Sequence, residues 1–148
     1  MDAFFAMLPA SSIGDPDGIV FETLDDGGRP SVAILVGPVA ERAFRGMRCA
    51  VAAMAAAGNN LIVDDVMLRA EMTEYEALLA GFTVHRVGVF TSLEVLEERE
   101  RRRGDRLIGL ARWQLDRVHK GAAYDLELDT TSTSPADCAR RIKERFGL

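Results

Sequence analysis

A short run of aliphatic residues, Leu61-Ile62-Val63, leads directly into two adjacent carboxylates, Asp64 and Asp65. An unbroken apolar run of this length is typical of a strand buried on both faces of a parallel sheet. In open α/β sheets the ligand crevice lies beyond the carboxyl ends of the strands, where these two acids would lie. The pattern therefore predicts either a Walker-B-like pair that orders hydrated Mg²⁺ beside a nucleotide phosphate, or an ordinary strand end whose Asp caps the next turn.

The remaining pattern alternates helical and strand-like segments around this stretch. Residues 10–31 are rich in Gly, Pro, Ser and Asp, and predict a loop excursion with a small strand at Ile19–Phe21 and a hairpin turn near Asp26-Gly27. Further strands are expected at Val84–Phe90 and Tyr124–Asp129, and helices at Met1–Pro9, Pro38–Gly58, Thr73–Ala80, Thr91–Arg103, Asp105–Lys120 and from Ser134 onward. This order predicts an α/β fold with a parallel sheet.

Composition narrows the class of protein. At 148 residues the chain is expected to form a single domain over residues 1–148. The net charge of −5 argues against a general nucleic-acid or membrane-surface binder. The N-terminal stretch has no basic residue typical of a signal peptide, and no apolar run is long enough to span a bilayer. We therefore expect a cytoplasmic protein.

An arginine-rich stretch follows the expected strand at Val84–Phe90. Residues 99–106 contain five arginines and no lysine. One interpretation is a solvated helix with acid–base pairs one turn apart. The other is a lid, because Arg is well suited to bidentate contacts with phosphate oxygens and Gly104 provides a hinge. A nucleic-acid patch fits less well, since acids are interleaved with the arginines.

Taken together, these motifs resemble the chloramphenicol 3-O-phosphotransferase-like family of small P-loop kinases, over nearly the whole chain. The residues that match the family are Gly37-Pro38, Ile62-Val63-Asp64-Asp65-Val66, Val87-Gly88-Val89, Arg99-Glu100, Arg103-Gly104-Asp105-Arg106, Gln114, Val118-His119-Lys120-Gly121, Tyr124-Asp125 and Asp129-Thr130-Thr131. The resemblance implies a three-layer, P-loop-kinase-like parallel sheet with helices on both faces. It also implies ATP-dependent transfer of the γ-phosphate to a hydroxyl of a small, chloramphenicol-like molecule, and hence a part in antibiotic resistance.

The resemblance also implies roles for individual residues, with ATP and Mg²⁺ as cofactors. Asp2 aligns with the catalytic base that takes the proton from the attacking hydroxyl. Asp64 and Asp65 fall on the Walker-B-like position that holds the metal. Arg99, Arg103 and Arg106 fall in the lid over the phosphates, and Arg103 and Arg106 stabilise the transferring group. His119 matches as well, but a histidine near a helix end is more often structural than catalytic.

The chain departs from the family in one respect. It contains no G-x-x-x-x-G-K-[ST] phosphate loop, and it starts at about the end of the family's second strand. We expect an N-terminally truncated kinase domain, in which the missing first strand leaves unpaired edges and an exposed apolar face. Two alternatives stay open. One is a catalytically inactive binding or assembly module, for example a homo-oligomer; the other is a kinase for a different small metabolite.

Overall fold

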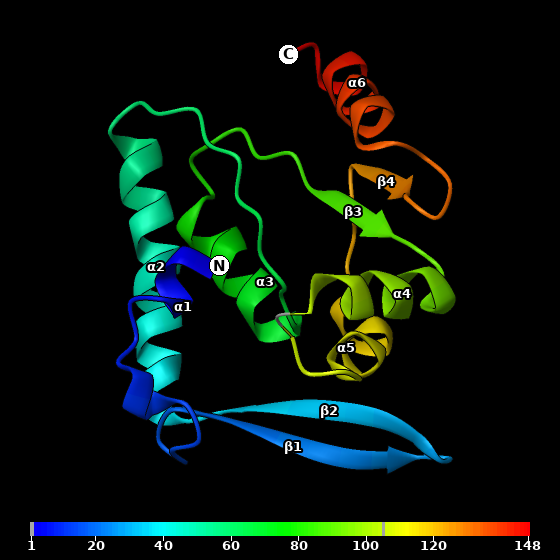
Figure 1. Cartoon of the computed structure of the whole chain (residues 1–148). Helices are drawn as coiled ribbons and strands as arrows, with labels where there is room; N and C mark the ends of the chain where they lie inside the picture. The colour runs from blue at the N-terminus through cyan, green and yellow to red at the C-terminus, as the bar shows by residue number, and fades with distance from the viewer. Residues whose placement is uncertain (1, 105) are drawn as a thin grey trace.

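The computed structural model describes residues 2–104 and 106–148, without the side chains of Asp2, Ala3 and Arg69. The helices and strands follow in the order α1 (Asp2–Phe5), η1 (Ala10–Ser12), β1 (Ile19–Asp26), β2 (Arg29–Val36), α2 (Pro38–Ala56), α3 (Arg69–Leu78), β3 (Val87–Phe90), α4 (Leu93–Arg103), α5 (Leu110–Val118), β4 (Leu126–Asp129) and α6 (Pro135–Phe146). Figure 1 shows α2 and α3 on one side of the molecule, α4 and α5 with β3 and β4 on the other, and the β1–β2 hairpin beneath both.

The N-terminal loop predicted from composition is largely a β-hairpin. β1 and β2 pair in antiparallel fashion from Ile19 opposite Val36 to Asp26 opposite Arg29. The turn consists of Gly27 and Gly28, whose φ angles of 61° and 80° suit the two-residue turns that match strand twist. The predicted turn position is confirmed, but the strands are much longer than predicted. The strands are longer because the turn needs only Gly27 and Gly28, so the polar residues on either side of it pair as part of the strands.

The expected parallel sheet is present only in part. β3 and β4 pair in parallel, with Val87 opposite Leu126 and Phe90 opposite Asp129. Among the described residues, β3 has no second strand neighbour. Residues 59–68 are irregular, so the predicted strand at Leu61–Asp65 is wrong for this structure. A strand forms only where a neighbour supplies its hydrogen bonds, and the wide three-layer sheet does not form among the described residues.

Several predicted helix ends are confirmed by their caps. Ser92 precedes α4 and its side chain accepts a hydrogen bond from the Val95 amide, while Gly104 ends α4 with φ of 68°. Ser134 caps α6 in the same way. α3 instead begins at Arg69, so the helix start predicted at Thr73 is wrong, because the helix has already completed its first turn there.

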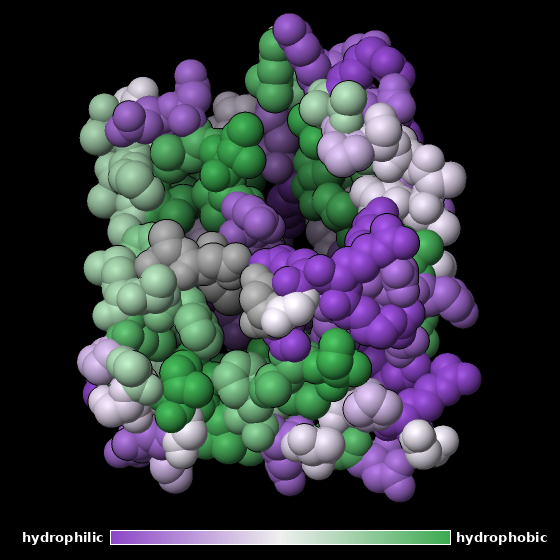
Figure 2. All heavy atoms as spheres, in the orientation of Figure 1, coloured by the Kyte–Doolittle hydropathy of each residue, from purple (hydrophilic) through white to green (hydrophobic). Residues whose placement is uncertain are grey.

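The hydrophobic core is divided between the two sides of the molecule. Buried residues include Ile19, Ala40 and Met47 around α2 and the hairpin, and Leu128 on β4. Ile62, in the irregular segment, is fully exposed, and Val89 on β3 is half-exposed. Figure 2 shows a hollow with hydrophobic surface on both sides, between the region of α2 and the region of β3. This agrees with the expected exposed apolar face.

Gly109 is the residue at which the hairpin and α5 come closest together. Its φ is 103°, and a Cβ added there would lie 2.5 Å from the Pro30 carbonyl oxygen. We expect Gly109→Ala to lower the free energy of unfolding by about 2–3 kcal/mol, because it adds backbone strain to a steric clash. Gly46 in α2 is the matched control, since a Cβ there meets nothing within 4 Å. Chemical denaturation should show stabilisation of about 1 kcal/mol for Gly46→Ala. Equal effects of the two substitutions would contradict this packing.

Candidate functional site

Asp64 and Asp65 lie within the irregular segment, a few residues before α3. Asp64 is exposed and Asp65 is half-buried. The Tyr75 hydroxyl donates a hydrogen bond of 3.3 Å to Oδ2 of Asp65. Among the described residues, Oδ1 of Asp65 is buried and has no hydrogen-bond partner. A buried carboxylate oxygen without a donor is costly, and it marks a place where a cation or water would be stabilising.

The surroundings of Asp65 and Tyr75 raise the pKa of both side chains. Burial raises the pKa of Asp65 above its ordinary value of 3.8. Burial, together with the negative charge of Asp65, raises the pKa of Tyr75 to about 12. Tyr75 therefore stays protonated and donates its hydrogen bond at neutral pH. The group that burial destabilises in its charged form is the Asp65 carboxylate. Perturbed carboxylates of this kind are often functional.

A second polar group joins α2 to α3 beside these residues. The Arg48 side chain is 8% exposed, and its Nε lies 2.5 Å from Oε2 of Glu74. Arg45, which is mostly exposed, lies 3.1 Å from the other oxygen of Glu74. Next to this ion pair is a cavity of about 240 Å³ lined by Val36, Glu41, Phe44, Arg48, Ala70, Glu71 and Glu74. The Arg48–Glu74 ion pair thus holds α2 and α3 in a fixed orientation to each other.

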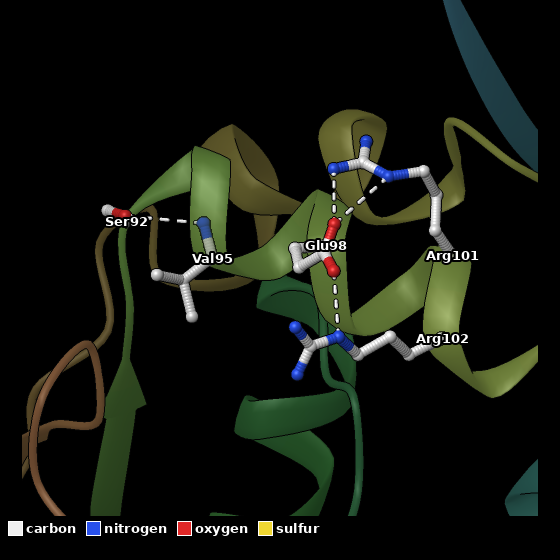
Figure 3. A network of polar contacts seen from close by, with 5 residues as sticks. All are labelled: Ser92, Val95, Glu98, Arg101 and Arg102. Carbon is white, nitrogen blue, oxygen red and sulfur yellow. Dashed lines mark hydrogen bonds and ion pairs between the residues drawn. The ribbon is translucent and has the colours of Figure 1, made fainter.

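The arginine-rich helix contains the acid–base pairs that the first interpretation predicted. Figure 3 shows Glu98 between Arg101 and Arg102, with nitrogen–oxygen distances of 2.8 and 2.7 Å. All three side chains are substantially exposed, so solvent screening leaves each pair only a small contribution to stability. These two arginines stabilise the helix surface and were not among the predicted site residues.

Arg99 contacts the carboxyl end of β4. Its guanidinium donates to the Thr130 hydroxyl at 3.1 Å and to the Thr130 carbonyl at 2.6 Å. Thr130 in turn donates its amide to the Phe90 carbonyl at 2.7 Å, which ties the ends of β3 and β4 together. Arg99 thus lies at the carboxyl edge of the parallel pair, and its guanidinium is hydrogen-bonded to the protein there.

The structure accounts for the predicted site residues to different degrees. Asp64 and Asp65 are adjacent to α3, and Arg99 lies on the β3–β4 edge. Arg103 ends α4 and Arg106 follows the Gly104 turn, and both are exposed. The backbone of Asp2 begins α1, while its side chain lies outside the described part of the chain. The roles assigned to all six residues therefore stay predictions.

His119 agrees with the structural interpretation. Its ring stacks on Phe90 with centroids 4.0 Å apart, and its Nδ1 lies 2.7 Å from the Tyr124 hydroxyl. Burial lowers the pKa of His119. The neutral ring packs between α5 and the β3–β4 pair, where it supports the sheet.

Sequence reasoning missed Tyr75, Arg48 and the role of Glu100. Tyr75 was placed at the start of the helix predicted from Thr73, with no contact to Asp65 expected. Arg48 occupies a polar position in an otherwise apolar helical stripe, which was a usable signal of a buried ion pair. Glu100 is 4% exposed within a run of charges, and nothing in that run distinguishes it from its exposed neighbours.

The described residues contain no cluster of three or more His, Cys, Asp or Glu side chains arranged to hold a metal ion. The carboxylate pair could supply two oxygen ligands, directly or through water, which suits Mg²⁺ because that ion usually keeps several waters. Within the same described ranges, no helix has the length and apolar character needed to cross a bilayer.

Comparison with known proteins places the chain in a family. The model for chloramphenicol phosphotransferase-like proteins matches residues 1–147, so the chain belongs to this family. Two relatives from Mycobacterium tuberculosis, strains CDC 1551 / Oshkosh and H37Rv, are each named "Putative O-phosphotransferase". Each is 36% identical over 111 residues, which cover 74% of this chain and 49% of the relative. The chain spans about half the length of these curated relatives.

Proposed function

We propose that this chain is the acceptor-side and lid part of an ATP-dependent phosphotransferase that transfers the γ-phosphate to a hydroxyl of a small molecule. The observation that supports the proposal most strongly is the family match across residues 1–147. The names of the two mycobacterial relatives agree with phosphate transfer to oxygen. A chloramphenicol-like alcohol is the first acceptor to test, and another small hydroxylated metabolite is the next.

In this proposal the carboxylates and arginines have separate tasks. Asp2 takes the proton of the attacking hydroxyl, which makes the oxygen a better nucleophile. Asp64 and Asp65 hold Mg²⁺, which would supply charge neutralisation beside the phosphates when bound. Arg99, Arg103 and Arg106 orient the transferring group and offset its negative charge. Catalysis of this kind depends on position and charge more than on covalent chemistry.

The residues of this chain fit the proposed cofactors in part. The unpartnered Oδ1 of Asp65 is chemically suited to a water-bound Mg²⁺. The 148 residues include no glycine-rich loop with a Lys-Ser or Lys-Thr end, so they do not by themselves supply the usual amide cradle for a triphosphate. We therefore assign the cradle to no residue of this chain.

A second candidate function is a non-catalytic assembly module that pairs with another copy of the chain. The observation that favours it is the exposed aliphatic surface, with Ile62 fully exposed and Leu61 and Val63 more than a third exposed. Large exposed apolar patches of this kind mark interaction sites. One edge of β3 has no strand neighbour among the described residues, and it could also accept a strand.

Calorimetry distinguishes the two candidates. The phosphotransferase predicts saturable MgATP binding to the purified chain, weak because no residue of it is assigned to the triphosphate cradle. This binding should weaken further when Asp64 and Asp65 are both changed to Asn. The assembly module predicts a dimer or larger assembly by light scattering and no heat of nucleotide binding. A monomer that binds no MgATP would contradict both candidates for this chain.

A further inference from the structure

A buried carboxylate ties the two ends of the arginine-bearing turn together. Glu100 lies in the last turns of α4 and is 4% exposed. Its Oε2 accepts a hydrogen bond of 2.8 Å from the Gly109 amide, and its Oε1 accepts one of 2.8 Å from the Ala111 amide. Gly109 precedes α5, so both donors belong to amides at the helix start that otherwise lack partners. The negative charge also faces the positive end of the helix dipole.

Two further contacts reinforce this connection. Arg112 of α5 pairs with Glu97 of α4, one turn before Glu100. The Gly109 carbonyl accepts the Val32 amide of the hairpin at 3.0 Å. The residues on either side of the Gly104 turn are thus held to each other and to β2. A movement of the end of α4 away from the start of α5 would therefore break buried hydrogen bonds.

We propose that Glu100 is a positioning residue that holds Arg103 and Arg106 as a preformed arch for a polyphosphate anion. This inference rests on the proposed function, since it takes the arginines as phosphate ligands. In this proposal Glu100 fixes the end of α4 against the start of α5, so that the two ends of the arginine-bearing stretch are ordered before the anion binds. Preorganised donors bind more tightly because their ordering cost is met on folding. Glu100 itself contacts no substrate.

The test compares wild type with Glu100→Gln, using Glu98→Gln as the matched control. In Glu100→Gln one of the two carboxylate oxygens becomes an NH₂ group, which is a donor and cannot accept the backbone N–H that this oxygen met. Glu98 lies on the same helix, but among the described residues its carboxylate pairs with the exposed Arg101 and Arg102 and contacts no amide of α5. Hydrogen exchange at the amides of Gly109 and Ala111 reports whether Glu100 accepts their hydrogen bonds. Calorimetric titration with inorganic tripolyphosphate reports how tightly Arg103 and Arg106 bind a polyphosphate anion.

We expect at least about tenfold faster exchange of these two amides in Glu100→Gln, and about tenfold weaker tripolyphosphate binding (about 1.4 kcal/mol). Glu98→Gln should leave exchange unchanged. Unchanged exchange in Glu100→Gln would show that the Glu100 hydrogen bonds do not hold these amides. Faster exchange with unchanged anion affinity would overturn the positioning role while sparing the proposed function.

A wild-type protein that shows protected amides but binds no tripolyphosphate would contradict anion binding by Arg103 and Arg106, and with it the phosphate role proposed for these arginines. If Glu100→Gln does not fold, Glu100→Asp provides the comparison, since it keeps the charge but shortens the side chain. Partial recovery of both amide protection and anion affinity in Glu100→Asp supports the assignment, and recovery of neither contradicts it.

Discussion

Replacement of Arg48 by Ala lowers the free energy of unfolding by about 2–3 kcal/mol in our account. Removing one member of a buried ion pair leaves the other charge without its partner, which commonly costs about 3–5 kcal/mol. The smaller value applies here because Glu74 is partly exposed and keeps its contact with Arg45. For a chain of this size the melting temperature should fall by about 5–10 °C.

Arg45→Ala is the control for this experiment, because Arg45 contacts the same carboxylate from an exposed position. Exposed pairs contribute at most about 1 kcal/mol, so its melting temperature should stay close to that of wild type. Thermal unfolding followed by circular dichroism measures both variants. A similar loss in the two would show that burial of Arg48 does not determine the strength of the contact between α2 and α3.

Asp65→Asn should stabilise the protein at neutral pH while impairing its activity. Burial raises the pKa of Asp65, so the folded state favours the protonated carboxyl. The stability linked to this group is fully present below its ordinary value of 3.8 and is lost as the pH rises through the raised value. The neutral amide avoids that loss and can still accept the hydrogen bond from Tyr75.

We therefore expect a higher melting temperature at pH 7 for Asp65→Asn than for wild type, and no gain below pH 3.8. Phosphate transfer should fall at least about tenfold if the carboxylate holds Mg²⁺. Asp64→Asn is the comparison, since the exposed Asp64 should affect activity with little change in stability. A loss of stability in Asp65→Asn at pH 7 would contradict a strained carboxylate.

Local features of the fold could be predicted from the sequence where a few neighbouring residues decide them. Gly104 and Ser134 define helix ends through a φ angle and a side-chain hydrogen bond, and both ends were predicted correctly. The start of α4 was predicted at Thr91, one residue before the observed cap, Ser92. The strand at Leu61–Asp65 was not, because a buried strand depends on a neighbour elsewhere in the chain. Its aliphatic composition indicates a buried partner that the described residues do not supply.

The candidate site shows the same division. The carboxylates and arginines could be recognised from their motifs, since family resemblance preserves residue type and spacing. Their surroundings could not, because Tyr75, Arg48 and Glu100 act through contacts between separate elements. Glu100 in particular lies among charges that look alike in sequence, and only its burial against α5 distinguishes it.

The central claim is phosphate transfer, and its most direct test is mass spectrometry of candidate acceptors. The purified protein is incubated with MgATP and a panel of hydroxylated small molecules that includes chloramphenicol, with Asp2→Asn as the control. Our account predicts that at least one acceptor gains the mass of one phosphate, and that loss of the base lowers the rate by about 10²–10⁴. A folded protein that transfers no phosphate to any member of the panel would contradict it.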